Sequence, residues 1–321
     1  MTTHLLDDHL KVGIARAAQW IREGELVAFP TETVYGLGGN GLSAQSAKKI
    51  YTAKGRPSDN PLILHIDRFD WIEELAKDYS EVVTNLARAF WPGPLTLVLP
   101  KKEIVPVEIT GGLDTVALRI PDHPVALRLI ESCNLPLAAP SANLSGNPSP
   151  TVPEHVMEDL NGRIKAVIDG GATRIGLEST VLDLSHGVPT ILRPGAVTLE
   201  QLKEVLPDVL QNGGEIAHSP GTRYRHYRPS VPVFICTEPN LSEELDGRSF
   251  ASEKCGFIGY HSQRFDRHIS IQTKPETYAE HLFAALRKLD KLGVDAIFVE
   301  PIAEEGLGIA VMDRLRRAAS N

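Results

Sequence analysis

The stretch "FPTETVYGLGGN", residues 29–40, interrupts the apolar character of the residues before it. Two threonines, a glutamate, a tyrosine and three glycines follow the apolar run "LVAF". The stretch is not a Walker phosphate loop, because no Gly-Lys-Ser/Thr closes it, and it contains no GxGxxG. Residues of this kind are typical of an ordinary loop between a strand and a helix. The alternative interpretation is a strand end at which glycines let a small ligand approach the backbone closely.

Strand and helix patterns alternate on both sides of this stretch. The strand patterns "PLILHI", "LTLVLP", "TVALRIP", "LPLAAPS", "AVIDGG", "STVLDLS" and "PTILRPG" interleave with helices expected at 43–53, 71–90, 124–132, 153–160 and 198–205. Some strands follow each other directly along the chain. We therefore expect an α/β fold with a twisted mixed sheet rather than a purely parallel one.

A change of pattern over residues 207–230 divides the chain. Proline and glycine flank this segment and no periodicity runs through it, so it is interpreted as a linker. We expect a first domain over residues 1–206 and a small Rossmann-like α/β domain over residues 231–321. The second domain contains four strand patterns and an amphipathic helix, "PETYAEHLFAALRKLDKLG".

Composition excludes several classes of protein. The chain has 321 residues, is 42% hydrophobic and carries a formal net charge of −8, which argues against a nucleic-acid binder held by bulk electrostatics but leaves room for a local basic patch. Cys133, Cys236 and Cys255 lack metal-ligand spacing and are interpreted as reduced thiols of a cytoplasmic protein. No signal peptide and no apolar run of membrane-spanning length is found, so no membrane association is expected.

Polar and basic residues gather at predicted strand ends, beside glycine and proline. Ligands of open α/β sheets bind where the loops at strand ends converge. Several basic groups together with hydroxyls and glycines suit a polyphosphate with bound metal. The candidates are Lys54, Arg56, Asn60 and His65 in "AKGRPSDNPLILH", Thr115 and Arg119 in "TVALRIP", Ser141, Ser145 and Ser149 in "PLAAPSANLSGNPSPT", Ser179 in "GLESTVLDL" and Arg193 in "ILRPG".

Each candidate also has a structural interpretation. Lys54 and Arg56 are compatible with solvated surface charges, and His65 with a hydrogen-bonded residue at the end of an apolar strand. Glu32 and Glu178 are too few to indicate a pair of catalytic carboxylates. No GxSxG, HExxH or Cys–His signature indicates a covalent nucleophile. This favours chemistry by positioning and charge neutralisation, as in phosphoryl or nucleotidyl transfer.

Taken in series, these stretches resemble the YrdC-like family. The matching motifs lie in the family's order across residues 20–206: "FPTETVYGLG", "KGRPSDNPL", "FWPGPLT", "ALRIPDHPVA", "PLAAPSANLSGNPSPT", "GLESTVLDL" and "ILRPGAV". One motif would be weak evidence, whereas a series in the same order is specific. The later "SPGTRYRHYRP" and the second domain resemble the long, two-domain form of the family.

The resemblance implies a YrdC-like catalytic domain and a reaction. L-threonine, bicarbonate and ATP would give L-threonylcarbamoyl-AMP and pyrophosphate, and downstream proteins would transfer the threonylcarbamoyl group to adenosine beside the tRNA anticodon. Mg²⁺ would accompany ATP, held chiefly by phosphates and water. Such a reaction requires no protein nucleophile, only a cradle for the triphosphate and a small pocket for the amino acid.

The resemblance also assigns residues to the two ligands. Thr33, His65 and Arg119 would form the L-threonine pocket, in which Arg119 is the bidentate clamp for the carboxylate. Ala139 and Ser179 would lie on the other side of the amino acid. The residues expected on ATP are Lys54, Arg56, Asn60, Thr115, Ser141, Ser149, Arg193 and either Tyr224 or Tyr227 of the linker.

The linker sequence "RYRHYRP" supports two interpretations. It is expected to form a lid over the active site, whereas its arginines interleaved with aromatic residues also suit a weak tRNA contact. For the whole protein, the alternative function is an RNA-binding module without catalysis. A carbamoyl-transfer enzyme of the hydrogenase-maturation kind is ranked last, because the CxxC pairs of its zinc-finger-like segments do not occur.

Overall fold

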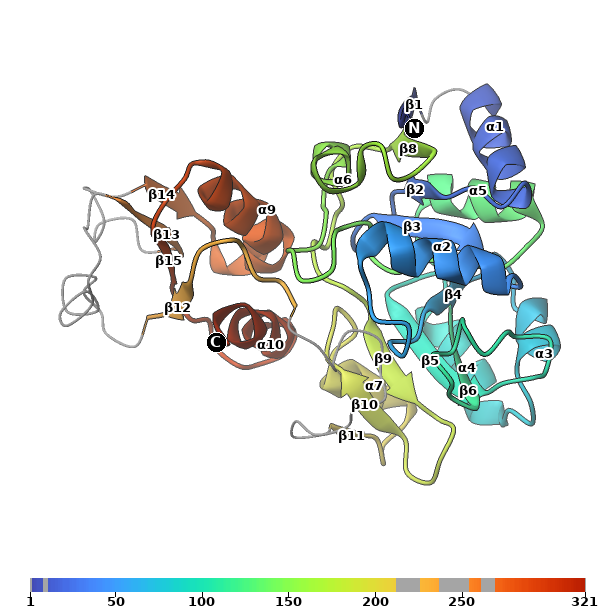
Figure 1. Cartoon of the computed structure of the whole chain (residues 1–321). Coiled ribbons are helices and arrows are strands. Elements are labelled where there is room, and N and C mark those ends of the chain that lie inside the picture. The colour runs from blue at the N-terminus through green and yellow to red at the C-terminus, as the bar shows by residue number, and fades with distance from the viewer. Residues whose placement is uncertain (1, 8–10, 212–225, 237–253, 261–268, 321) are drawn as a thin grey trace. The chain divides into compact units, whose positions relative to one another are not determined.

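The computed structural model describes the chain except for residues 1, 8–10, 212–225, 237–253, 261–268 and 321 (Figure 1). The chain divides into two compact units. The N-terminal unit comprises residues 1–145 and 150–223, and the C-terminal unit comprises residues 146–149 and 224–321. The residue pattern did not indicate that segment 146–149 belongs with the C-terminal unit.

The strands of the N-terminal unit form one mixed sheet of eleven strands, in the order β1-β8-β2-β3-β7-β4-β6-β5-β9-β10-β11. Parallel and antiparallel neighbours alternate irregularly across it, which confirms the prediction of a mixed sheet. The strands are β1 (His4–Asp7), β2 (Val27–Phe29), β3 (Gly36–Asn40), β4 (Ile63–His65), β5 (Leu95–Pro100), β6 (Thr115–Arg119), β7 (Leu137–Ala138), β8 (Ala166–Asp169), β9 (Thr180–Asp183), β10 (Thr190–Arg193) and β11 (Leu210–Gln211).

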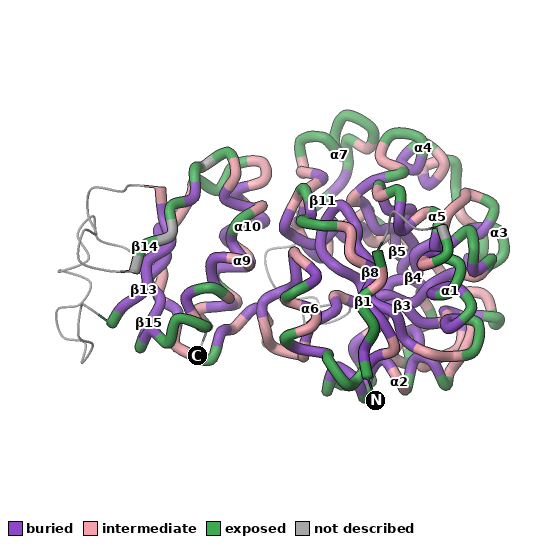
Figure 2. The backbone as a smooth tube through the Cα atoms, turned by 90° about the horizontal axis from the view of Figure 1, so that it is seen from above, coloured by how far each residue is buried: buried purple, intermediate pink, exposed green. Residues whose placement is uncertain are grey.

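Helices cover the two faces of this sheet unequally. The main core lies between one face and five helices: α2 (Ala44–Lys54), α3 (Asp70–Leu75), α4 (Glu81–Phe90), α6 (Pro153–Leu160) and α7 (Leu199–Val205). On the other face, α1 (Lys11–Arg22) and α5 (Pro124–Cys133) pack together over β2, β7 and β8 (Figures 1 and 2). Neighbouring residues of one strand divide between the two cores, because side chains alternate across a sheet: Ala28 faces the main core and Phe29 the second.

The helical pattern expected over residues 71–90 is divided in the structure. α3 ends at Leu75, and the following Ala76 forms an isolated bridge with Lys101 beside β5. Asp78 then adopts a left-handed conformation with φ of 39° before α4 begins at Glu81. Pairing with the neighbouring segment therefore overrides a continuous helical periodicity.

The glycines of the opening stretch belong to strand β3 and not to a loop. β2 and β3 pair in antiparallel fashion, and residues 30–35 connect them. A Cβ atom on Gly38 would lie 2.9 Å from the Phe29 ring, and one on Gly41 would lie 2.7 Å from Pro136 O. The loop interpretation is wrong for β3. Gly38 in β3 and Gly41, which follows β3, each leave room for protein atoms. The approach of a ligand to the glycines of this stretch stays a prediction.

The C-terminal unit contains a separate parallel sheet of four strands, in the order β12-β15-β13-β14. Parallel pairing with helical crossovers agrees with the predicted Rossmann-like pattern. Within the described residues, no helix of either unit is long and apolar enough to cross a membrane. The elements of this unit are β12 (Val233–Ile235), β13 (Cys255–Gly259), β14 (Ile269–Gln272), the 3₁₀ helix η3 (Pro275–Thr277), α9 (Tyr278–Lys291), β15 (Ala296–Val299) and α10 (Leu307–Ala319).

The substitution Gly41→Ala tests the close packing beside β3. The Gly41 amide donates to Pro136 O at 2.8 Å, so an added methyl group can be accommodated only if the backbone shifts. We expect the free energy of unfolding, measured by chemical denaturation, to fall by about 1–3 kcal/mol. The exposed substitution Asn85→Ala on α4 is the control and should change it by less than about 0.5 kcal/mol. Equal stability of Gly41→Ala and the unaltered protein would contradict the interpretation.

Candidate functional site

One part of the second face of the N-terminal sheet carries a small apolar floor to which no described helix contributes. Ile63, Val98, Ala117 and Val181, from β4, β5, β6 and β9, form this floor. Because side chains alternate along a strand, residues two positions away point to the same face. These neighbours are polar: His65 on β4, Thr96 on β5, Thr115 and Arg119 on β6, and Ser179 before β9.

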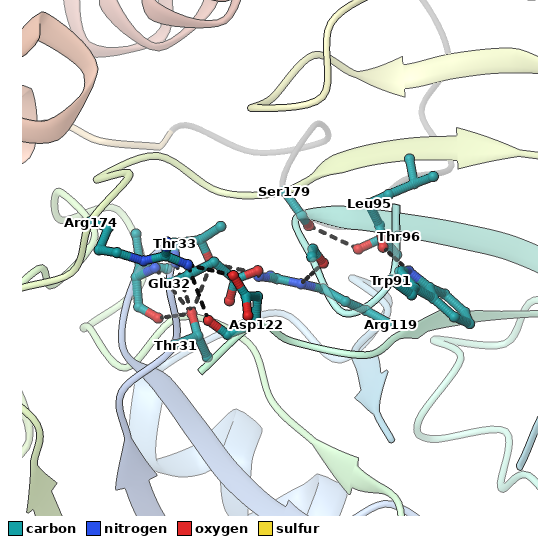
Figure 3. A network of polar contacts seen from close by, with 12 residues as sticks. Thr31, Glu32, Thr33, Trp91, Leu95, Thr96, Arg119, Asp122, Arg174 and Ser179 are labelled. Atoms are coloured by element: carbon teal, nitrogen blue, oxygen red, sulfur yellow. Dashed lines mark hydrogen bonds and ion pairs between the residues drawn. The ribbon is translucent and has the colours of Figure 1, made fainter. Parts of the chain in front are cut away.

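Arg119 contacts residues from two different loops in the polar network of this face (Figure 3). Its side chain is buried; Nε donates to Gly93 O at 3.2 Å and Nη1 donates to Thr33 Oγ1 at 3.1 Å. Nη2 lies 2.6 Å from Glu32 Oε1 in an ion pair that lacks the geometry of a directed hydrogen bond. Thr33 Oγ1 in turn lies 2.8 Å from Thr31 Oγ1. The guanidinium therefore ties β6 to the loop between β2 and β3.

His65 lies beside Arg119, because the two residues are register partners in β4 and β6. Its ring meets Phe29 edge-on at 6.1 Å, and within the described residues Nδ1 has no hydrogen-bond partner. Burial, together with the nearby Arg119 charge, lowers the pKa of His65 to about 3. The imidazole is therefore neutral near pH 7 and can share a hydrogen bond with a ligand hydroxyl. On the other side of β4, the Ala139 amide donates to Ile63 O at 2.9 Å.

Ser179 is fixed by two neighbours. Its hydroxyl lies 2.8 Å from Thr96 Oγ1, and Arg193 Nη2 donates to Ser179 O at 2.9 Å and to Ser179 Oγ at 3.1 Å. Backbone also approaches closely here, because a Cβ atom on Gly195 would lie 2.3 Å from Thr180 N. Arg193, expected on the nucleotide side, thus supports a residue expected on the amino-acid side.

The residues expected on ATP form two further internal connections. Lys54 Nζ donates to Ser141 O and to Asn143 O, each at 2.6 Å. Arg56 Nη2 donates to Asn60 Oδ1 at 2.6 Å. Lys54 is 2% exposed and Arg56 is 9% exposed, so the interpretation of both as solvated surface charges is wrong. In this structure both cations hold the loops that carry the other predicted nucleotide contacts.

Two further predicted residues belong to the other unit, and a third is not described. Ser149 and Tyr227 belong to the C-terminal unit, where the Tyr227 ring stacks on Phe283 at 5.0 Å and lies 5.6 Å from the Arg314 guanidinium. Tyr224 lies outside the described residues. The contact of either tyrosine with a nucleotide, and the lid expected of the linker, stay predictions.

Sequence reasoning did not assign Glu32 to the site. Its side chain is fully enclosed and forms the ion pair with Arg119. A signal was present, because an acid three residues after the buried strand "LVAF" is costly to bury unless it is paired. Thr96 was missed for a similar reason: a hydroxyl in an apolar strand is inconspicuous until a partner such as Ser179 is known.

No group of three or more His, Cys, Asp and Glu side chains in the described part of the chain could hold a metal ion. The polar residues around the floor supply cations, hydroxyls and one neutral imidazole. Such groups suit the oxygens of an anionic ligand and leave a divalent cation to be coordinated by that ligand and by water.

The fold and the site define an α/β protein in which buried cations, hydroxyls and a neutral imidazole surround a small apolar floor. Comparison with protein families gives the class a name. The Sua5/YciO/YrdC family, described as telomere recombination, matches residues 19–195, and the C-terminal domain of threonylcarbamoyl-AMP synthase matches residues 197–320.

Individual relatives agree with this result. A threonylcarbamoyl-AMP synthase of Pyrococcus abyssi is 51% identical over 94% of this chain and 93% of its own length. The Bacillus subtilis protein of the same name is 45% identical over 95% and 92%. A crystal structure of P. abyssi Sua5 complexed with L-threonine superimposes with a TM-score of 0.92 at 47% identity, covering 99% of this chain and 98% of that one. The chain belongs to the threonylcarbamoyl-AMP synthase family.

Replacing Glu32 tests the buried ion pair. Glu32→Gln leaves the Arg119 charge buried without its partner, so we expect the free energy of unfolding to fall by about 3–5 kcal/mol. The control is Asp122→Asn, which breaks the exposed pair between Arg174 and Asp122, 2.5 Å apart, and should cost about 0–1 kcal/mol. Both values follow from denaturant titration. Equal, small losses in the two variants would contradict a special role for the buried pair.

His65 predicts a pH dependence of stability. Its pKa is lowered to about 3 from the ordinary value of 6.5, so below about pH 6.5 the unfolded chain takes up a proton that the folded protein does not. The stability contributed by His65 is therefore present above pH 6.5 and is lost as the pH falls toward 3. We expect the protonation of His65 in the unfolded chain to lower the free energy of unfolding by about 2 kcal/mol between pH 7 and pH 5.

The measurement compares denaturation of the unaltered protein and of His65→Gln at several pH values. The variant should lose less stability between pH 7 and pH 5 than the unaltered protein does. His186→Gln, which removes an exposed histidine, is the matched control. Parallel curves for the unaltered protein and His65→Gln would show that His65 is not the group responsible.

Proposed function

We propose that the protein forms L-threonylcarbamoyl-AMP from L-threonine, bicarbonate and ATP, with release of pyrophosphate. The observation that carries this proposal is the buried Arg119 guanidinium, held among Glu32, Gly93 and Thr33 at the edge of an apolar floor. A guanidinium in that setting is suited to an amino-acid carboxylate. The proposal is also supported by the similarity to a P. abyssi protein whose structure was determined with L-threonine.

The chemistry follows from the reactants. Bicarbonate gives CO₂ and hydroxide. The neutral amine of threonine adds to the carbon of CO₂ to give a carbamate, and the proton that it loses combines with the hydroxide to form water. A carbamate oxygen then attacks the α-phosphorus of ATP, and the bond to the β-phosphate oxygen breaks with pyrophosphate as the leaving group. No protein nucleophile takes part. The cysteines fit this scheme, because all three are buried and burial raises the pKa of the Cys133 thiol to about 12.

The residues around the floor would bind threonine by complementary groups. Arg119 would hold the carboxylate, Thr33 would contact the polar end of the amino acid, and Ser179 or the neutral His65 would bond its hydroxyl. The apolar floor would take the methyl group. Loss of the hydroxyl leaves buried polar groups unpaired, whereas loss of the methyl group only empties an apolar space, so valine should be rejected more strongly than serine.

ATP would lie beside this pocket, close to Arg56, Asn60, Thr115, Ser141 and Arg193. Mg²⁺ bound to the triphosphate would neutralise charge on the phosphates during transfer. The product is an activated mixed anhydride, which requires an acceptor. We propose that separate proteins use it to modify adenosine beside a tRNA anticodon in the cytoplasm, where free cysteines are ordinary.

An RNA-binding module without catalysis is less well supported. Nucleic-acid binders present unpaired cations to the phosphate backbone. Here Lys54, Arg56 and Arg193 are buried and bonded to the protein's own loops. A weak tRNA contact through the linker is still compatible with catalysis.

The first test is pyrophosphate release from ATP and Mg²⁺, with threonine and bicarbonate omitted in turn. Release should require both, and serine should support it about 10–200-fold less well than threonine. Valine should support pyrophosphate release even less well than serine. Thr33→Val, which removes the hydroxyl at nearly constant volume, should raise the KM for threonine. Release that does not depend on threonine would overturn the proposal, as would salt-sensitive tRNA binding without release.

A further inference from the structure

A pocket lies on the N-terminal unit, lined by residues that none of the site assignments uses. Its volume is about 390 Å³, and we call it the Trp91 pocket. It lies between α4, the residue before α3 and the residue after β6. Its lining consists of Phe69, Thr84, Ala87, Arg88, Trp91 and Ile120.

The walls of the Trp91 pocket are mainly apolar, and one cation lies among them. Phe69, Ala87, Trp91 and Ile120 provide aromatic and aliphatic surface. Arg88 is exposed and, within the described part of the chain, forms neither an ion pair nor a hydrogen bond. A pocket of this size with apolar walls and an exposed arginine in its lining is complementary to a small carboxylate that has an apolar body.

The wall of the Trp91 pocket is connected to the Arg119 network. The Trp91 indole is held in place, because Nε1 donates to Leu95 O at 2.7 Å. Two residues along the same loop, the Gly93 amide donates to Ile120 O at 2.8 Å. The Gly93 carbonyl then accepts from Arg119 Nε at 3.2 Å. One loop therefore forms a wall of the pocket on one side and supports the guanidinium on the other.

We propose that the Trp91 pocket is a second binding site, for a small carboxylate with an aromatic or branched aliphatic body, and that its occupation strengthens threonine binding. A ligand between Trp91 and Ile120 restrains the loop that positions Arg119. Threonine then binds to a guanidinium whose support is already ordered, which lowers the cost of binding. The coupling is reciprocal, so threonine strengthens binding in the pocket by the same factor. The strengthening of threonine binding rests on the proposed function, whereas the existence of the binding site does not.

The binding test uses phenylacetate and its neutral counterpart phenylacetamide as probes of the full chain. Phenylacetate should bind with a Kd of about 1 mM or below. Phenylacetamide should bind at least about tenfold more weakly, because it cannot pair with Arg88. Arg88→Gln should abolish the difference, and Arg128→Gln, on the exposed side of α5, should preserve it. Equal affinities for the two probes, or an Arg88→Gln protein with unchanged preference, would overturn the site.

Spectroscopy locates the bound probe. Protein labelled with ¹⁵N in tryptophan gives indole signals from Trp20, Trp71 and Trp91, and Trp91→Phe identifies the last. Phenylacetate should shift the Trp91 signal, whereas Trp20, which lies among Arg16 and Lys165, should not respond. A Trp20 shift without a Trp91 shift would show binding elsewhere and would overturn the assignment.

The coupling test measures threonine affinity by calorimetry, with and without saturating phenylacetate. We expect an increase of about fivefold, the lower end of common allosteric couplings. In Arg88→Gln the same addition should have no effect. An unchanged threonine affinity while phenylacetate occupies the pocket would overturn the coupling. If threonine itself does not bind, the proposed function fails while the binding test of the pocket still stands.

Discussion

The N-terminal unit depends on keeping one charge, the Arg119 guanidinium, away from water. An isolated buried cation is too costly to persist, so every contact around it is a requirement of the fold. The carboxylate of Glu32 balances the charge, and Gly93 O and Thr33 Oγ1 accept from the other nitrogens. These partners come from distant parts of the chain. A single buried side chain thus fixes the loop after β2, the loop before β5 and the end of β6 against one another.

The other buried cations act in the same way on the neighbouring loops. Lys54, the last residue of α2, holds the backbone at Ser141 and Asn143, and Gly55 ends that helix in a left-handed conformation. Arg193 holds Ser179. The residues of the site are therefore held in place without a ligand, which reduces the ordering that binding would have to impose. Replacing one of these cations should therefore disturb the site twice, because the substitution removes a charge and also releases the loop whose carbonyls the cation held.

Much of this architecture follows from residue patterns, and the exceptions have physical causes. Strands such as "LTLVLP" and "TVALRIP" are apolar enough to identify, and the motif series identified the family. β3 was missed because glycines rarely favour strands, and only the neighbouring Phe29 ring explains Gly38. Glu32 was missed because a buried ion pair joins residues far apart in the sequence. The break between α3 and α4 was missed because a tertiary bridge at Ala76 produces it.

If the Arg119 site holds the amino acid, as proposed, its charge balance limits how it can select one. The Glu32 carboxylate offsets the charge of Arg119, and the low pKa of His65 keeps that ring neutral near pH 7. Net electrostatic attraction of the ligand's carboxylate therefore contributes little to binding, and directed hydrogen bonds must determine which amino acid is bound. Each terminal nitrogen of a guanidinium carries two hydrogens, so Arg119 can keep Thr33 and Glu32 and still donate to a carboxylate. A ligand that supplies both a carboxylate and a hydroxyl satisfies the guanidinium and the imidazole together, and one that lacks either leaves a buried group unpaired.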